Sequence, residues 1–167
     1  TGSDSVIKVE ADGDLTIQDR NTTTQHTFNP HCKYQFWYID MWELDKDGSK
    51  IVSGGVITGG GGDQNNAGGT LTMAGGSIVG CSARSRGGGV YLAYDSATGK
   101  SGTFIMTGGS IIGCAAQLGG GVYVAPECTF AMATGSNIHN CIANNDGGGV
   151  INHGTFQMHG GTISACT

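Results

Sequence analysis

The sequence predicts an all-β protein, a parallel β-helix (solenoid) of about four to five coils with an inserted aromatic β-hairpin. One phrase of about twelve residues occurs four times, with copies that begin at Thr70, Thr103, Thr129 and Thr155. A second phrase, three glycines followed by a short apolar run, lies between these copies and begins at Gly87, Gly119 and Gly147. Phrases that recur every 26 to 33 residues indicate stacked structural units.

The composition agrees with this fold class and excludes several others. Glycine supplies 32 of the 167 residues, well above the roughly 7% of an average protein, without the Gly-X-Y period of collagen. Charged residues make up only 13%, the net charge is -5 and no basic stripe is present, so we expect no nucleic-acid partner. Because no apolar run approaches the ~20 residues of a membrane helix, we expect no membrane insertion.

The first phrase alternates apolar residues with small or polar ones, which is typical of a half-buried strand. Equivalent residues of successive coils should lie about 4.8 Å apart and form ladders inside the stack. The expected ladders are phenylalanines at Phe104, Phe130 and Phe156, methionines at Met73, Met106, Met132 and Met158, and isoleucines at Ile78, Ile111, Ile138 and Ile163. In the second phrase, Tyr91 and Tyr123 should face outward as a side ladder. Each repeat is thus expected to hold three short strands separated by Gly-Gly bends.

The front of the chain matches the same pattern with one interruption. Three segments match strands of the repeat, at 6–9, 15–17 and 54–60. An insertion at 20–51 therefore divides the first coil, and regular coils follow over 52–167. We expect a shortened bend with no third strand at 60–69. Residues 1–167 are expected to form a single domain and to be a fragment of a longer protein.

The insertion is the aromatic part of the chain, since it holds 6 of the 12 aromatic residues. We expect a strand over 34–44, a turn at 45–48 and a return strand from Ile51, which together make a β-hairpin. Either the hairpin covers a flank of the stack, or its aromatic side chains form a recognition surface. In the second interpretation the binding candidates, together with the tyrosine ladder, are Tyr34, Trp37, Tyr38 and Trp42.

Four cysteines occupy the end of the first phrase and should form a further ladder, at Cys81, Cys114, Cys141 and Cys166. We expect buried reduced thiols that act as small apolar side chains. Disulfides between adjacent coils and a soft-metal stack are the alternatives. No metal site or cofactor is expected, because Glu43-x-Asp45-x-Asp47-Gly48 lacks the closing glutamate of a calcium loop and the histidines fall mostly at turns.

No catalytic residues are evident in the repeats. Their carboxylates fall near predicted turns, at Asp63, Asp95, Glu127 and Asp146, and none recurs in an equivalent position. Polysaccharide lyases and hydrolases need carboxylates that converge on one face. We therefore expect a protein that is not an enzyme, with a fragment of a carbohydrate-active enzyme as the alternative.

Phrases such as GGSIVGCSA, GGGVYV and TFIMTGGSI resemble the right-handed parallel β-helix repeats of gut-bacterial surface proteins, which are related to polymorphic outer-membrane and autotransporter adhesin repeats. The resemblance implies a right-handed stack, in keeping with the general preference for right-handed crossovers. It also implies a bacterial cell-surface or secreted adhesin or stalk segment that presents its rod and hairpin to host glycans or host proteins. Because an uncapped final coil exposes strand edges, end-to-end self-association is a further expectation.

Overall fold

The computed structural model describes residues 7–9, 14–17, 25–28, 35–36, 39–40, 50–53, 56–58, 63–65 and 68–167. Every regular element within these ranges is a β-strand, and equivalent strands of successive repeats pair in parallel. The predicted all-β class with predominantly parallel strands is therefore confirmed. Within the same ranges, no helix combines the length and the apolar composition needed to cross a membrane.

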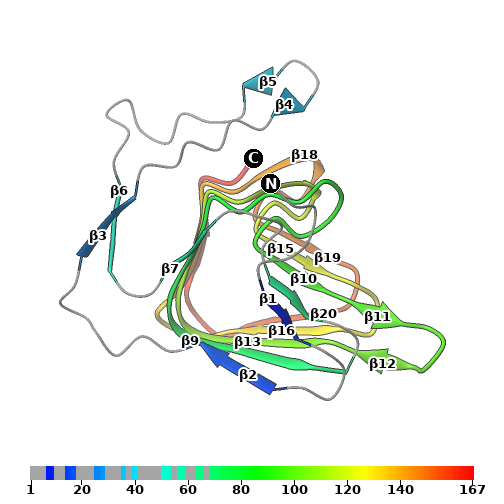
Figure 1. The fold of residues 1–167 in the computed structure, drawn as a ribbon. Helices are drawn as coiled ribbons and strands as arrows, with labels where there is room; N and C mark the ends of the chain where they lie inside the picture. Colours follow the sequence, from blue (N-terminus) through cyan, green and yellow to red (C-terminus); the bar gives the residue numbers. More distant parts are fainter. Residues whose placement is uncertain are drawn as a thin grey trace.

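The largest sheet is built from the first phrase. Its strands, in spatial order, are β2 (Asp14–Ile17), β9 (Thr70–Val79), β13 (Thr103–Ile112), β16 (Thr129–Met132) and β20 (Thr155–Met158). Past a bend, the same sheet continues through β7 (Val56–Thr58), β17 (Ser136–His139) and β21 (Thr162–Ser164). Figure 1 shows the sheet along the bottom of the molecule and, past the bend, up its left side. The expected matches of 15–17 and 54–60 to the repeat are confirmed, because Leu15 pairs with Leu71 and Ile57 with Ile78.

The bend itself differs from the prediction of separate strands in every repeat. In β9 and β13 the strand runs through the bend, where Gly76 and Gly109 adopt positive φ angles of 76° and 87°. Glycine tolerates this conformation because it lacks a Cβ atom. The third copy carries one extra residue, and its strand divides into β16 and β17. There the buried Ser136 hydroxyl donates a 2.8 Å hydrogen bond to the Met106 carbonyl of the neighbouring repeat.

The second phrase builds another parallel sheet. Its strands, in spatial order, are β1 (Ile7–Val9), β8 (Asp63–Asn65), β10 (Val90–Leu92), β15 (Val122–Val124) and β19 (Val150–Asn152). The expectation of no strand at 60–69 is wrong, because β8 lies there between β1 and β10. The polar Asp-Gln-Asn sequence of β8 lacks the alternation of a strand, but its backbone pairs on both sides.

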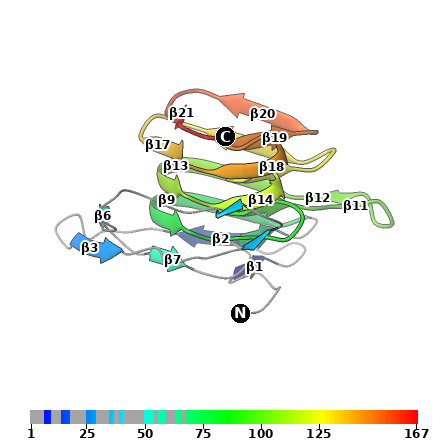
Figure 2. The same cartoon turned by 90° about the horizontal axis from the view of Figure 1, so that it is seen from above.

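A third side of the stack was missed by the sequence pattern. The segment after the phrase-ending cysteine forms β14 (Ala115–Leu118), which pairs in parallel with β18 (Ile142–Asp146). Isolated bridges at Ser82 and Arg86 continue this side into the preceding repeat. Figure 2 shows the successive repeats lying one above another.

The 33-residue interval between Leu71 and Phe104 exceeds the later 26-residue intervals because this repeat carries a side hairpin. Its strands β11 (Tyr94–Asp95) and β12 (Lys100–Ser101) pair antiparallel and project from the stack (Figure 1). The hairpin accounts for the extra residues without changing the register of the core strands on either side.

The insertion at 20–51 pairs differently from the prediction. β3 (Gln25–Phe28) pairs antiparallel with β6 (Lys50–Ser53), and β4 (Gln35–Phe36) pairs antiparallel with β5 (Ile39–Asp40). A continuous strand over 34–44 is therefore wrong, because β4 and β5 both fall within this range and pair antiparallel with each other. The return strand, expected to pair with 34–44, pairs with β3 instead.

The core lies between the repeats and consists of like residues stacked on like. Ring centroids in the predicted phenylalanine ladder lie 4.9 Å apart for both pairs, and the planes differ by 10° and 13°. The methionine and isoleucine ladders also pair in register, as predicted. Their fully buried members are Met73, Met106, Met132, Ile78, Ile111 and Ile138. Each repeat thus buries its apolar side chains only against its neighbours.

Candidate binding surface

The outer face of the second-phrase sheet carries an aromatic column. Val90 and Leu92 are fully buried, so the residue between them, Tyr91, points to the opposite face of the strand. Tyr91 pairs in register with Tyr123, and their rings meet edge to face with centroids 5.4 Å apart. The predicted side ladder of tyrosines is therefore present, and Ile151 occupies the next position of the column.

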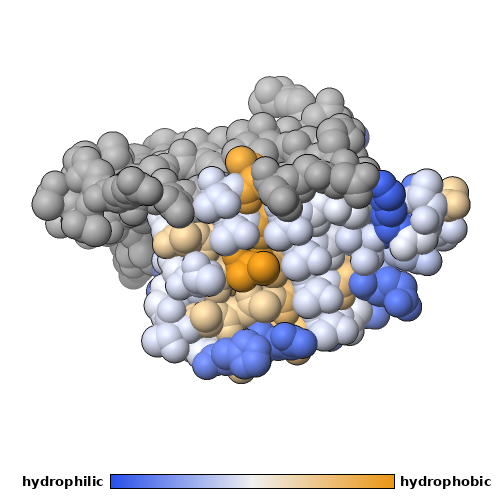
Figure 3. Space-filling model, turned by 90° about the horizontal axis from the view of Figure 1, so that it is seen from below, coloured by the Kyte–Doolittle hydropathy of each residue, from blue (hydrophilic) through white to orange (hydrophobic). Residues whose placement is uncertain are grey.

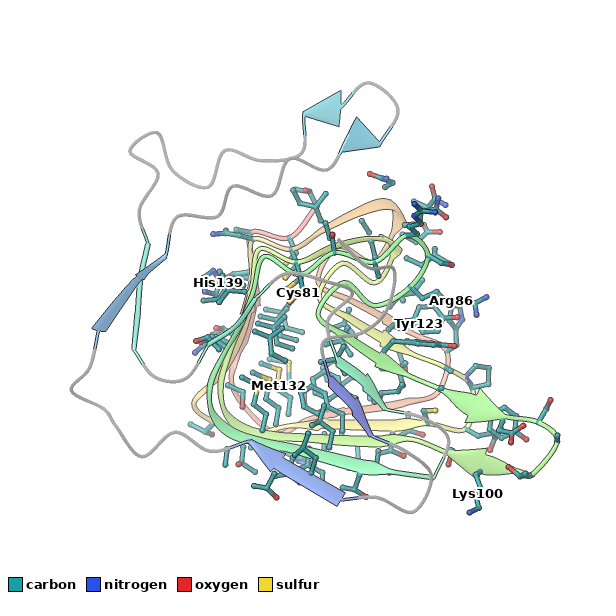
Figure 4. All side chains as sticks on the ribbon, in the orientation of Figure 1. Cys81, Arg86, Lys100, Tyr123, Met132 and His139 are labelled. Atoms are coloured by element: carbon teal, nitrogen blue, oxygen red, sulfur yellow. The ribbon has the colours of Figure 1, made fainter. Side chains whose placement is uncertain are left out.

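Two further side chains enclose Tyr123. The His153 ring lies 5.5 Å from the Tyr123 ring, and the Arg86 guanidinium lies 5.2 Å from the centroid of the same ring. Tyr123 is consequently only 6% exposed, so it is not the open contact platform that was expected of a binding residue. Arg86 is exposed and Tyr91 is half-buried, and these two side chains present the cluster to solvent. Figure 4 shows Arg86 and Tyr123 at the same outer corner of the stack.

Arg86 brings a positive charge to this corner. Within the part of the chain that the structure describes, the interaction shown for the Arg86 guanidinium is the one with the Tyr123 ring, and no ion pair neutralises it. A guanidinium over an aromatic ring keeps its charge and most of its N–H donors available. The corner can therefore offer forked hydrogen bonds to a carboxylate or sulfate beside an aromatic surface. We call Arg86, Tyr91, Tyr123 and His153 the aromatic corner.

The outer face of the first-phrase sheet has a different character. Its outward positions in β9, β13, β16 and β20 carry threonine, alanine, isoleucine and glutamine, and threonines stack in register from Thr70 to Thr155. Figure 3 shows this face as mostly pale, with apolar atoms gathered in its middle. None of those described outward positions carries a charge, so an ionic ligand would favour the aromatic corner.

The other binding candidates fall on the insertion. Tyr34, Trp37, Tyr38 and Trp42 lie outside the described residues.

The cysteine ladder lies inside the stack, where Figure 4 places Cys81. Among the described cysteines, those of the ladder are free thiols, and each directs its Sγ atom toward a backbone carbonyl oxygen 3.2 to 3.9 Å away. Burial raises the pKa of the Cys114 thiol, and neighbouring thiols of the column raise it further. The described His, Cys, Asp and Glu residues form no group of three or more that could hold a metal ion. The ladder therefore acts as apolar packing between repeats.

The Asp95 side chain forms hydrogen bonds within the side hairpin. Its carboxylate accepts hydrogen bonds from the Thr98 hydroxyl at 2.7 Å and from the Ala97 backbone N–H at 2.9 Å, which closes the turn of the side hairpin. The hydrogen bond from Thr98 and that from Ala97 lower the pKa of Asp95 below its ordinary value. A general acid in glycoside hydrolysis needs a raised pKa, so Asp95 is suited to the turn and not to proton donation.

The sequence pattern singled out the tyrosines but missed Arg86 and His153. Arg86, Tyr123 and His153 belong to three different repeats and are separated by 37 and 30 positions along the chain. Arg86 directly precedes its Gly-Gly-Gly phrase, whereas Tyr123 follows its own phrase, so the repeat alignment gives no signal that the two side chains meet. Comparisons with protein-family models, curated proteins and solved structures found no match.

Proposed function

We propose that the stacked repeats form a right-handed parallel β-helix, and that the chain is a non-enzymatic segment of a bacterial cell-surface or secreted protein. The segment is an adhesin or stalk that presents a rigid rod to host glycans or host proteins. Support for the rod comes from the in-register parallel pairing of β9, β13, β16 and β20. The right-handed sense rests on the strong preference of parallel crossovers for that hand.

The aromatic corner is the observation that carries the binding proposal. An exposed guanidinium held over a tyrosine ring, beside a second half-buried tyrosine, combines a charge-assisted donor with a flat apolar surface. Sugar rings pack on such aromatic surfaces through their apolar face, and Arg pairs with acidic substituents. We therefore propose an acidic glycan, or an acidic patch on a host protein, as the ligand.

The rigidity of the stack supports this role. Tyr123 is fixed by ring contacts to Tyr91 and His153 and by the strand pairs of β15 on both sides. A side chain that is already ordered loses little conformational entropy when a ligand binds. The corner is thus organised before the ligand arrives, as expected of a surface that recognises an extended polymer.

Binding of the 167-residue chain to arrays of acidic and neutral glycans and of matrix proteins tests the proposal. Arg86→Gln and Tyr91→Ala should each weaken acidic-glycan binding by at least about tenfold, because the charged fork or the aromatic surface is lost. Arg84→Gln is the matched control, since it removes an exposed charge of the same sign two residues away. Each variant must first keep the wild-type β-sheet circular dichroism spectrum.

The insertion is tested in the same experiment with a Trp37→Ala/Trp42→Ala variant. Loss of binding in this variant alone would show that the recognition surface is the hairpin and not the aromatic corner. An equal loss of binding in Arg84→Gln and Arg86→Gln would show that binding depends on net charge and not on the aromatic corner. No binding by the wild type would contradict the adhesin role and leave a structural spacer.

A further inference from the structure

The cysteine ladder brings sulfur atoms of successive repeats together in the core. The Ala115 N–H donates a 2.9 Å hydrogen bond to the Cys81 carbonyl, and the Ile142 N–H donates one of 2.8 Å to the Cys114 carbonyl. This parallel pairing sets the Cα atoms of successive cysteines about 4.8 Å apart. Cys81, Cys114 and Cys141 are fully buried, so three consecutive thiols are removed from solvent.

The sulfur atoms of the two inner cysteines repeat with the spacing of the backbone. Each of these thiols lies near two carbonyl oxygens, that of the residue two positions before it and one in the preceding repeat. For the Cys114 Sγ atom the two distances are 3.5 and 3.8 Å, and for the Cys141 Sγ atom they are again 3.5 and 3.8 Å. Equal distances to equivalent atoms mean that the two side chains share one rotamer. Their Sγ atoms are therefore displaced by one strand spacing, about 4.8 Å.

This spacing is too long for a disulfide and matches a metal bridge. The sulfur atoms of a disulfide lie about 2.05 Å apart, so both side chains would have to leave their rotamers to form one. A bond between a thiolate and a d10 metal ion is about 2.3 Å long, as it is for zinc. Two such bonds in line span about 4.6 Å, close to the distance between the two Sγ atoms. Thiolate ligands select soft metal ions.

The groups around the two sulfur atoms are mostly apolar. A Cβ atom added to Gly121 would lie 3.3 Å from the Cys141 Sγ atom, and one added to Gly89 would lie 3.4 Å from the Cys114 Sγ atom. The same added atoms would lie within 2.8 Å of Cγ2 atoms of the isoleucine ladder. Because an isolated charge is costly in such surroundings, a bound ion should leave the site uncharged. Two thiolates balance the charge of a divalent cation.

We propose that Cys114 and Cys141 form a linear, two-coordinate site for a soft divalent d10 cation, with Hg(II) as the best-matched ion. Two S–H bonds are replaced by two Hg–S bonds and two protons are released, while neither sulfur nor the metal changes its oxidation state. A linear site needs only two ligands, so it agrees with the finding that the described residues form no metal-binding group of three or more. This inference goes beyond the proposed function and does not depend on it.

Hg(II) titration of two variants of the full 167-residue chain tests the proposal. The adjacent-pair variant keeps Cys114 and Cys141 and replaces the other cysteines with alanine. The split-pair variant keeps Cys81 and Cys141 instead, whose thiols belong to the same ladder but lie two strand spacings apart, about 9.6 Å. Both variants must first show the wild-type β-sheet circular dichroism spectrum.

We expect the adjacent-pair variant to bind one Hg(II) ion with release of two protons, and X-ray absorption to show two sulfur neighbours at about 2.3 Å. The split-pair variant should bind at least about 100-fold more weakly, because each of its thiols must act alone. Zn(II), which takes four ligands in structural sites, should not compete. Equal affinity in the two variants, or a single sulfur neighbour in the adjacent-pair variant, would overturn the proposal.

A crystal of the wild-type chain loaded with substoichiometric Hg(II) provides a second test that needs no substitution. Anomalous scattering should place the ion between the Sγ atoms of Cys114 and Cys141. An ion bound to any other cysteine would overturn the assigned pair. A disulfide between Cys114 and Cys141 would overturn the sulfur spacing on which the site rests.

Discussion

At the scale of single residues, the stacked phenylalanines show how identical side chains make the core. Phe130 is fully buried, and its ring lies 4.9 Å from the rings of both Phe104 and Phe156. The parallel in-register pairing of β13, β16 and β20 imposes this arrangement, because equivalent Cβ atoms point the same way at the same height. In this protein, apolar side chains are therefore buried by contact between neighbouring repeats.

Phe130→Ala is expected to lower the free energy of unfolding by about 3–5 kcal/mol, because it leaves a cavity between two rings whose backbones are fixed by the sheet. Chemical denaturation followed by circular dichroism measures the loss. Phe156→Ala is the comparison, and its cost should be smaller, since that side chain is only half-buried. A loss below about 1 kcal/mol for Phe130→Ala would contradict the inward stack.

The hydrogen bonds of Asp95 predict that the stability of the side-hairpin turn depends on pH. Because hydrogen bonds from Thr98 and Ala97 lower the pKa of Asp95 in the folded hairpin, ionised Asp95 favours the turn at pH values above 3.8, its ordinary value. This contribution is lost as the pH falls through the lowered pKa. NMR titration of the Ala97 and Thr98 amides should show a midpoint below 3.8.

Thr98→Val removes the hydroxyl donor and should move that midpoint upward, toward the ordinary value. Thr107→Val, on the outer face of β13, is the control and should leave the midpoint unchanged. An Asp95 titration that is the same in the wild type and in Thr98→Val would show that the hydroxyl does not hold the carboxylate.

At the scale of elements, the Gly-Gly-Gly phrase fixes how closely the repeats approach at one corner. A Cβ atom placed on Gly120 would lie 2.3 Å from the carbonyl oxygen of Ile142 and 2.5 Å from that of Gly148. The Gly120 N–H also donates a 3.1 Å hydrogen bond to the Gly147 carbonyl, which holds the two backbones together. Glycine is therefore required here for close approach of the chain to itself.

Gly120→Ala is expected to cost about 3 kcal/mol of unfolding free energy, at the upper end for overpacking, because the colliding atoms belong to paired backbone. Gly99→Ala is a matched control in the side hairpin, where φ is +70° but no atom lies within 4 Å of the added methyl group. It should cost about 1 kcal/mol, from backbone strain alone. Thermal unfolding of the two variants measures the difference, and equal effects would contradict the steric role of Gly120.

At the scale of the whole molecule, the stack behaves as a one-dimensional array. Each repeat contacts the repeats before and after it, so its stability depends on interfaces on both sides. The β13, β15 and β16 strands have partners on both sides, whereas β19, β20 and β21 have one each in the described chain. Local opening should consequently be easiest at the β19–β21 end.

Amide hydrogen exchange of dilute protein is expected to show the slowest exchange in β13, β15 and β16 and faster exchange in β20 and β21. The physical reason is that the last strands have one neighbour and exposed core side chains such as Met158. Uniform exchange rates along the chain would instead indicate a single cooperative unit.

The sequence by itself determined the all-β class, the parallel stacking and the internal ladders of phenylalanine, methionine, isoleucine and cysteine. It could do so because stacked repeats place like residues in contact. The spacing of identical residues along the chain therefore indicates which side chains touch. Local alternation, as in β13, adds the inward or outward direction of each side chain.

Tertiary structure alone decided the features that depend on neighbours. β8 is a strand because β1 and β10 pair with its backbone, although its side chains are polar. In the insertion, β3 pairs with β6, although β4 and β5 lie between them in the sequence and pair with each other. Arg86, Tyr123 and His153 meet at one corner because stacking brings together residues from three repeats. A local pattern records what each strand buries, whereas the identity of its neighbour depends on how the whole chain winds.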